Sequence, residues 1–291
     1  MIKVLYLILN FKTYSDTIRV TNELLQTERT DFKILIVDNA SPNESYNEIS
    51  KFFAGNELVE VILSPENGGY AKGNNFGLRY AKKYNPEYVC IMNNDVHFSW
   101  ETINALIDIY PKLDSAALIT PIQYLPNNKI APLSSLKVPN FLYDLRLYSL
   151  FFRNKAHKYI SNSKFDNVQQ IGLVPGAFML ANYNVLKKVG FFNECTFLFC
   201  EERFLAKEIE LKGYKNYAIL DLKYIHEHSK TISTETSRKR QQDLMFEGRS
   251  LYIQKYGKYP KIEVLILKIA RKIYDCELKI ISIIKKACRK S

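Results

Sequence analysis

The stretch Lys33-Ile-Leu-Ile-Val-Asp-Asn-Ala-Ser41 sets a short apolar run directly before an acid and an amide. The run is rich in β-branched residues and too short for a helix, so it predicts a buried strand. Helical patterns alternate with such runs, and repeated strand-helix-strand units favour an α/β fold with a Rossmann-like, doubly wound, mostly parallel sheet. Ligands bind beyond the carboxyl ends of the strands in such sheets. The other predicted strands are residues 3–9, 58–63, 88–92 and 116–120, and the predicted helices are about 15–26, 42–53 and 71–84.

The alternation stops after residue 125, where Pro126, Pro132 and Pro139 precede a run of aromatic residues. We expect an insertion that lies over the sheet up to residue 170. Strand and helix patterns then return at 171–180, 201–211 and 217–220. The predicted parts of the chain are residues 1–125 and 126–230, which form one domain, and a C-terminal amphipathic helical extension, 231–291.

Composition limits the class of protein. The chain has 291 residues, 47% of them hydrophobic, which is enough to bury a full core without disulfides or a structural metal. Its five cysteines include no C-x-x-C pair, which favours a reduced, cytoplasmic compartment. The apolar runs are shorter than a signal-peptide core or a membrane-spanning helix, so we expect neither secretion nor integral insertion.

The net charge of +11 is unevenly distributed. Residues 255–291 hold 11 basic and 3 acidic residues, so this tail carries +8 and the first 254 residues carry only +3. A charge of +3 is a poor electrostatic match for a phosphate backbone, and no nucleic-acid partner is expected for the main domain.

Four polar clusters follow apolar runs: residues 38–41, 66–77, 93–95, and the pair Glu201-Glu202 with His226 some two dozen residues later. Each has an ordinary structural explanation, since Asp38 could cap a helix, glycines could make a tight turn, and paired acids suit the first turn of a helix. Their joint occurrence at predicted strand ends indicates a ligand site.

The motifs in these clusters resemble those of the inverting family 2 glycosyltransferases of GT-A fold, especially their rhamnosyltransferase-like and galactofuranosyltransferase-like bacterial branch. The resemblance covers about residues 1–230 in order. The matching runs are V-D-N-A-S (37–41), N-G-G-Y-A-K-G-N-N-F-G (67–77), N-N-D (93–95), G-A-F-M-L (176–180), V-G-F-F-N-E (189–194), F-L-F-C-E-E (197–202) and I-H-E-H-S (225–229).

The resemblance implies a nucleotide-sugar donor, UDP- or dTDP-linked, in the first half of the domain. Asp38 matches the acid that hydrogen-bonds the pyrimidine ring. Asp95 matches the last acid of the metal-binding D-x-D motif, where Asn93 replaces the first acid, and His226 would complete the shell of Mn²⁺ or Mg²⁺. The single carboxylate predicts weaker cation binding. The other residues expected on the donor side are Asn67, Gly69, Lys72, Asn74 and Asn94.

The second half is expected to bind the acceptor and supply the general base. Glu202 matches the second acid of the family's E-D pair, and Glu201 is the substitute candidate. A glutamate is one methylene longer than the usual aspartate, and Phe204-Leu205 stands where relatives often carry a further acid. Trp100, which could instead be a packing residue, and Gly176 are the candidate acceptor contacts.

These residues predict a metal-assisted, inverting transfer of a sugar (rhamnose, galactose, galactofuranose or glucose type) to a growing, lipid-linked polysaccharide of a capsule or cell wall. Two alternatives stay open. A sugar nucleotidyltransferase would open with a glycine-rich basic loop, which Leu9-Asn10-Phe11-Lys12 does not provide. The second is a module that keeps the nucleotide-binding fold without turnover and binds an anionic membrane or nucleic acid.

The tail has an apolar stripe at helical spacing with basic flanks, which suits an amphipathic helix lying on an anionic membrane. We therefore expect residues 261–290 to attach the protein peripherally to the inner face of the plasma membrane. In the alternative, the stripe packs on the catalytic domain or pairs two copies in a homodimer. The stripe comprises Ile262, Leu265, Ile266, Ile269, Ile273, Ile280, Ile284 and Ala287, and the flanks hold Lys268, Arg271, Lys272, Lys279, Lys285, Lys286, Arg289 and Lys290.

Overall fold

The computed structural model describes residues 2–131, 136–150, 167–227 and 238–288, with side chains up to residue 284 in the last helix. One mixed sheet forms its centre, with strand order β3-β2-β1-β4-β8-β6-β9-β5 and β7 paired to β9. The strands are β1 (Val4–Asn10), β2 (Phe32–Asp38), β3 (Val59–Leu63), β4 (Tyr88–Asn93), β5 (Val96–His97), β6 (Ala116–Tyr124), β7 (Val168–Ile171), β8 (Phe178–Asn182) and β9 (Lys215–His226).

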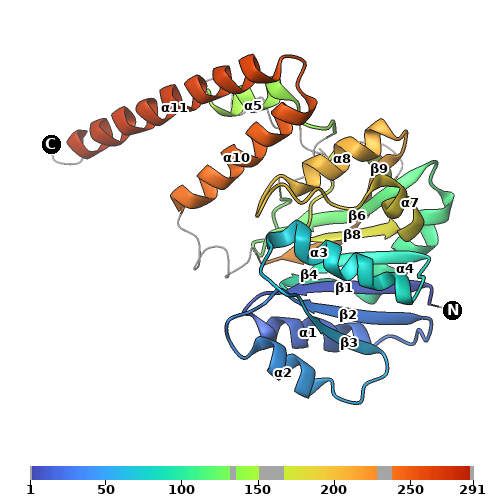
Figure 1. Ribbon diagram of the computed structural model, residues 1–291. Coiled ribbons are helices and arrows are strands. Elements are labelled where there is room, and N and C mark those ends of the chain that lie inside the picture. Colours follow the sequence, from blue (N-terminus) through green and yellow to red (C-terminus); the bar gives the residue numbers. More distant parts are fainter. Residues whose placement is uncertain (1, 132–135, 151–166, 228–237, 289–291) are drawn as a thin grey trace.

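Helices cover both faces of this sheet (Figure 1). Apolar side chains of α1, α2 and α4 pack on one face, and those of α3, α7 and α8 pack on the other. The helices are α1 (Tyr14–Leu25), α2 (Ser45–Phe52), α3 (Gly69–Tyr80), α4 (Trp100–Ile109), α5 (Phe141–Leu147), α7 (Tyr183–Val189), α8 (Glu201–Leu211), α10 (Arg238–Tyr256) and α11 (Pro260–Cys288), with short 3₁₀ turns η1 (Ala81–Lys83) and η2 (Tyr110–Lys112).

The first half of the domain confirms the predicted doubly wound pattern. Strands β3, β2, β1 and β4 are all parallel, and in the register of β1 with β2 Asn10 lies opposite Asp38. The carboxyl ends of these strands therefore meet at one edge of the sheet.

The second half departs from the prediction in its strand directions. Strand β8 lies between β4 and β6 and is antiparallel to both, and β9 runs parallel to β6. The pattern that returns at 171–180 belongs to two strands, because β7 ends at Ile171 and β8 begins at Phe178. The loop between β7 and β8 contains Gly176. Because the loop is not part of a strand, it can lie along the edge of the sheet.

The predicted insertion does not lie over the sheet in its described part. Helix α5 instead packs with α10 and α11, where Phe141 and Tyr148 cover Ile253, Val264 and Leu267. Figure 1 shows α10 and α11 beyond the end of the sheet, next to α5 and α8. The rest of that prediction, residues 132–135 and 151–166, lies outside the described residues.

Candidate active site

The polar residue that ends β1 is joined to the one that ends β2. Asn10 donates from Nδ2 to Oδ2 of Asp38 (2.7 Å), and the backbone N–H of Ser41 donates to Oδ1 of Asp38 (2.8 Å). Asp38 is fully buried, and these two hydrogen bonds hold the loop that follows β2. Its contact with a nucleotide base stays a prediction, and it would add a second hydrogen bond at one of these oxygens. A hollow of about 550 Å³ opens beside the loop, and it is lined by Ala40, Ser41, Leu63, Ser64, Pro65 and Phe76.

The Asn67-Gly-Gly-Tyr70 loop begins α3 and crosses to the second half of the domain. Oδ1 of Asn67 accepts from Nδ2 of Asn39 (3.0 Å), which ties this loop to the end of β2. Gly69 has a φ of +82°, and a Cβ there would lie 1.8 Å from the carbonyl oxygen of Phe197. Only glycine allows this approach, so the loop and the segment before α8 form one wall.

The third cluster gathers Asp95, Asn93 and His226 at the ends of β4 and β9. Nε2 of His226 lies 3.0 Å from Oδ1 of Asp95 and 3.4 Å from Nδ2 of Asn93. Asp95 is 7% exposed, and its two carboxylate oxygens are buried without a hydrogen bond. Burying a carboxylate destabilises the folded protein unless a group of opposite charge lies close to it. The cluster therefore fits a divalent cation, with one carboxylate, one imidazole and one amide oxygen as its protein ligands.

Gln123, which no motif pointed to, orients His226 from behind. Its Nε2 lies 3.2 Å from Nδ1 of His226, and its Oε1 accepts from the hydroxyl of Tyr224 (2.8 Å). A 180° flip of the Gln123 amide would place its oxygen beside an Nδ1–H of His226. The lone pair on Nε2 of His226 would then be available for a metal, the arrangement usual for histidine ligands. The cluster has one carboxylate and one imidazole, and its third group is an amide. Among the described residues, no group of three or more His, Cys, Asp or Glu side chains could hold a metal.

The paired acids open α8, directly after Phe199 and Cys200, which both have a φ of +71°. The carboxylate of Glu202 accepts from the backbone N–H of Gly176 and is partly exposed, whereas Glu201 is 2% exposed. Tyr70 donates its hydroxyl proton to the carbonyl oxygen of Gly176 (2.6 Å). Since the N–H of Asn93 donates to the carbonyl of the next residue, Ala177 (2.9 Å), the base candidate and the cation cluster flank one short stretch of chain.

Burial sets the protonation of this pair. Desolvation raises the pKa of the Glu202 carboxyl above its ordinary value. Desolvation, followed by repulsion from Glu202, raises the pKa of Glu201 well above its ordinary value. A carboxylate with a raised pKa is a stronger base than one in water, which suits it to accept a proton from a hydroxyl.

Three residues predicted to contact donor or acceptor have their side chains bonded elsewhere in the structure. Trp100 packs on Tyr6 and donates its indole N–H to the carbonyl of Glu23 near the far end of α1, so it does not line this site. Asn74 is buried in α3, and its amide donates back to the carbonyl of Tyr70. Asn94 donates to the hydroxyls of Thr13 and Thr17, and so fastens the loop after β4 to α1.

Gly176 lies against Glu202, and its contact with an acceptor stays a prediction. Lys72 is exposed and pairs with Glu66 across 3.1 Å, so its contact with a phosphate stays a prediction. Tyr70, whose hydroxyl bonds Gly176, was not among the predicted site residues. Its place in the quoted N-G-G-Y motif was the signal in the sequence that could have identified it.

A buried ion cluster fastens α8 to the C-terminal helices. Nη1 of Arg203 donates to Oδ1 of Asp144 in α5 (2.9 Å), and Nη2 of Arg203 forms an ion pair with Oδ2 of Asp144 at 2.7 Å. The guanidinium also lies 3.8 Å from the ring centre of Tyr252 in α10. Nε of Arg249, also in α10, lies 3.6 Å from the same carboxylate. The residue that follows Glu202 is thus held by two elements outside the sheet.

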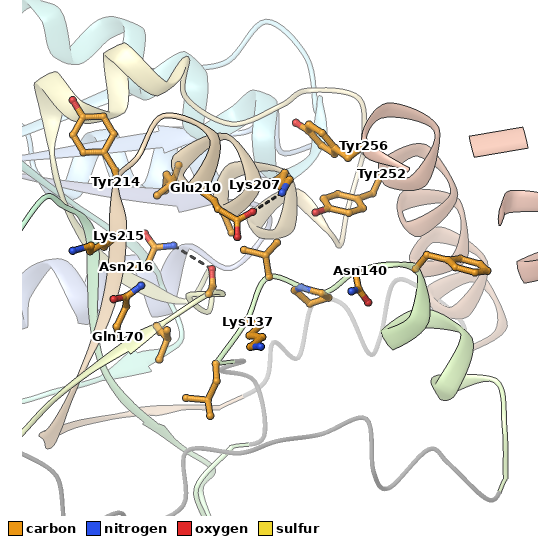
Figure 2. A pocket seen from close by; sticks show the side chains of 18 of the residues that line it. Lys137, Asn140, Gln170, Lys207, Glu210, Tyr214, Lys215, Asn216, Tyr252 and Tyr256 are labelled. Carbon is orange, nitrogen blue, oxygen red and sulfur yellow. Dashed lines mark hydrogen bonds and ion pairs between the residues drawn. The ribbon is translucent and has the colours of Figure 1, made fainter. Parts of the chain in front are cut away.

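A second cavity, of about 620 Å³, lies on the flank of α8 away from these clusters (Figure 2). It is bordered by α10 and by residues 136–141, and Tyr252, Tyr256 and Asn216 are among its lining residues. None of the predicted site residues lines it.

Residues 8–171 match the family described as Glycosyl transferase family 2, which is more than half of the chain. The chain belongs to this family. A curated relative, the low-salt glycan biosynthesis hexosyltransferase Agl10 of Haloferax volcanii, is 25% identical over 171 residues, which are 58% of this chain and 50% of the relative. The chain thus spans about half the length of that relative.

Solved structures establish the fold of this family 2 member as GT-A. GalNAc-T7 with UDP, GalNAc and Mn²⁺ has a TM-score of 0.65 at 11% identity, with 90% of this chain and 49% of that chain covered. TarS of S. aureus with UDP-GlcNAc has a TM-score of 0.60 at 14% identity, covering 91% and 70%. The mannosyltransferase PcManGT of Pyrobaculum calidifontis with GDP-Man and Mn²⁺ has a TM-score of 0.59 at 15% identity, covering 96% and 75%.

Proposed function

We propose that this glycosyltransferase transfers a hexosyl or deoxyhexosyl group, with inversion, from a nucleoside diphosphate sugar to a hydroxyl of a growing glycan. One observation carries the proposal. The carboxylate of Glu202 lies against Gly176, and the backbone N–H of Asn93, which belongs to the cluster of Asp95 and His226, donates to the carbonyl of Ala177. The candidate base and the cation cluster therefore meet at one short stretch of chain. A donor sugar bound between them would have the base on the face opposite the leaving diphosphate, as an inverting displacement requires.

Asp95, His226 and the amide oxygen of Asn93 would hold Mn²⁺ or Mg²⁺ at the diphosphate side. When bound there, the cation would neutralise the charge that develops on the leaving diphosphate. The protein supplies only one carboxylate, so the phosphate oxygens of the donor would contribute much of the cation's coordination. Cation binding and donor binding should therefore be coupled.

Glu202 would accept the proton of the acceptor hydroxyl. The bond between the anomeric carbon and the diphosphate oxygen breaks while the acceptor oxygen bonds to the same carbon from the other face. The N–H of Gly176 orients the carboxylate, and the Tyr70 hydroxyl fixes the carbonyl of Gly176. Because this base sits on a rigid helix start that is braced by Arg203, little reorganisation is needed during the reaction.

For the donor we propose UDP or dTDP carrying a rhamnose, galactose, galactofuranose or glucose type sugar. The motifs in residues 37–41 and 67–77 support this choice. The fold's neighbours include complexes with UDP-GlcNAc and with GDP-Man, so a guanosine donor belongs in the same test. For the acceptor we propose a lipid-linked polysaccharide intermediate of a capsule or cell wall.

Two measurements test this function. A panel of nucleotide sugars with Mn²⁺ should raise the melting temperature for the true donor, since a ligand at 100 times its Kd stabilises the fold by about 2.7 kcal/mol. The same donors should be hydrolysed slowly without acceptor. A donor that stabilises the protein but shows no turnover with any acceptor or water would favour the binding module.

Glu202→Gln tests the base, because the amide keeps the size of the side chain but accepts no proton. Turnover should fall by about 10²–10⁴-fold while the Kd of the donor stays within about twofold. Glu201→Gln is the matched control and should retain most activity. The assignment is wrong if the control abolishes turnover while Glu202→Gln loses less than about tenfold.

A further inference from the structure

Helix α11 has an inner face that fastens it to the protein. Val264 and Leu267 are buried against α10 and α5. One turn later Arg271 pairs with Asp243 of α10, and the ring of Tyr274 lies 6.0 Å from that of Tyr148. These contacts fix the rotation of the helix about its axis.

The opposite face of α11 is apolar and exposed. At about 100° per residue, its large apolar side chains fall on one stripe that points away from Val264 and Leu267. Their exposed fractions run from 40% to 67%, which is unusual for side chains of this size. This outer face comprises Ile262, Leu265, Ile266, Ile269, Ile273, Ile280, Ile283 and Ile284.

The two borders of the outer face differ in charge. Four exposed lysines, Lys261, Lys268, Lys272 and Lys279, project along one border because their spacing returns them to the same side of the helix. Exposed Asp275 lies beside this lysine border and is paired with Arg271 at 3.8 Å. The other border carries Glu263 and Glu277, which are partly buried. The side chains of Lys285, Lys286 and Ala287, and residues Arg289 and Lys290, lie outside those described.

We propose that the outer face of α11 lies in the headgroup region of an anionic membrane, with the lysine border against lipid phosphates. An apolar stripe with a cationic border is the pattern by which a helix binds in the plane of such a surface. A soluble partner protein would have to cover the whole stripe, whereas a membrane covers a stripe of any length. In the part of the chain that the structure describes, no helix is long and apolar enough to cross a bilayer.

This contact does not depend on the proposed reaction. If the membrane contact and the proposed reaction are both correct, α11 brings the start of α8, which carries Glu202, to the surface where a lipid-linked acceptor is located. Since α5 and α10 join α11 to α8, the orientation of the active site to the membrane would be set by packed helices.

Vesicle co-sedimentation of the full chain tests the proposal without donor or turnover. The protein should sediment with phosphatidylglycerol-containing vesicles and much less with pure phosphatidylcholine. Ile269→Glu/Ile273→Glu should weaken the partition coefficient by at least about tenfold. Phe52→Glu/Leu211→Glu changes two exposed apolar residues outside α11 by the same charge and should bind as the wild type does.

The lysine border is tested by Lys268→Gln/Lys272→Gln, which should weaken binding to anionic vesicles by about fivefold for each lysine at low salt. The same variant should bind pure phosphatidylcholine as weakly as the parent. Equal binding of variant and parent to anionic vesicles would overturn the role given to the lysines.

Cys276 offers a direct reporter, because it is exposed and its spacing of three from Ile273 and four from Ile280 places it within the outer face. A polarity-sensitive fluorophore on Cys276, with Cys195 and Cys288 changed to serine, should shift to the blue when anionic vesicles are added. The matched control carries the fluorophore on Cys195, which is exposed outside α11, and should not shift.

Absence of vesicle binding by the full chain would overturn the proposal. It would also fall if sedimentation velocity gave a dimer that Ile269→Glu/Ile273→Glu converts to a monomer, with no blue shift on vesicles, because a second copy would then cover the face. Donor-induced stabilisation, measured on the same samples, reports separately on the proposed function. Failure of one is thus distinguishable from failure of the other.

Discussion

Gly176→Ala perturbs the candidate base without touching its carboxylate. A Cβ at residue 176 would lie 2.4 Å from Oε1 of Glu202. Real Cβ atoms essentially never approach closer than 3.0 Å, so the carboxylate must retreat by at least 0.6 Å, the difference between 3.0 and 2.4. A misplacement of about 1 Å costs about 10²-fold in rate, so kcat should fall by about 10- to 100-fold.

The assay is steady-state transfer, with donor affinity measured separately by calorimetry. The Kd of the donor should stay within about threefold, because Gly176 contacts the base and the clash moves a side chain away from the diphosphate side. Gly213→Ala is the control: nothing lies within 4 Å of its Cβ position and its φ is +76°, so it should cost only stability, about 1 kcal/mol, at unchanged kcat.

A second change separates displacement from general damage. Aspartate is one methylene shorter than glutamate, so Glu202→Asp leaves room for the alanine methyl. In the parent, Glu202→Asp should lower kcat; in the Gly176→Ala background the same change should restore part of it. Additive losses in the double variant, or a fully active Gly176→Ala enzyme, would refute the geometry.

Three further outcomes are expected. Asp95→Ala should abolish metal-dependent donor binding by calorimetry, whereas Asn93→Asp should tighten Mn²⁺ binding by adding a carboxylate; full turnover in excess chelator would contradict the cation site. Burial raises the pKa of Glu201, so the folded chain keeps a proton that the unfolded chain releases above about 4.5, and the free energy of unfolding should fall by about 1.4 kcal/mol per pH unit up to the raised pKa. Glu201→Gln should lose that slope in urea titrations, and an unchanged slope would show that another group causes it. Arg203→Met removes the nearer partner of buried Asp144 and leaves Arg249 at 3.6 Å, and it should cost about 3 kcal/mol by urea unfolding; Arg203→Met/Asp144→Leu should recover part of this.

The sequence predicted those parts of the fold that depend on local pattern. Apolar runs of about four to six residues mark β1, β2 and β4, because a strand buried on both faces needs apolar side chains at nearly every position. The outer strand β3 includes Glu60 and buries only Val59. Asp38 ends β2 and Asp95 follows β4 by two residues, so their nearness to the sheet edge was predictable before any tertiary contact was known. Glu202 instead opens α8 after an irregular segment, and its place beside this edge was not predictable from a strand end.

Only the tertiary structure decided which of these residues meet. Gly176 reaches Tyr70 across 106 positions, and Gln123 reaches His226 across 103, through strand pairings that no local periodicity specifies. The antiparallel insertion of β8 between β4 and β6 places Gly176 at this edge, and the parallel pairing of β6 with β9 places Gln123 beside His226. Tertiary packing also decides where Trp100 and Asn94 point, although both stand close to Asp95 in the chain. Trp100 donates to the carbonyl of Glu23, and Asn94 donates to the hydroxyl of Thr17, so both side chains are bonded to α1. Local sequence sets which groups end each strand, whereas the order and direction of the strands, chosen by burial over the whole chain, set what each group faces.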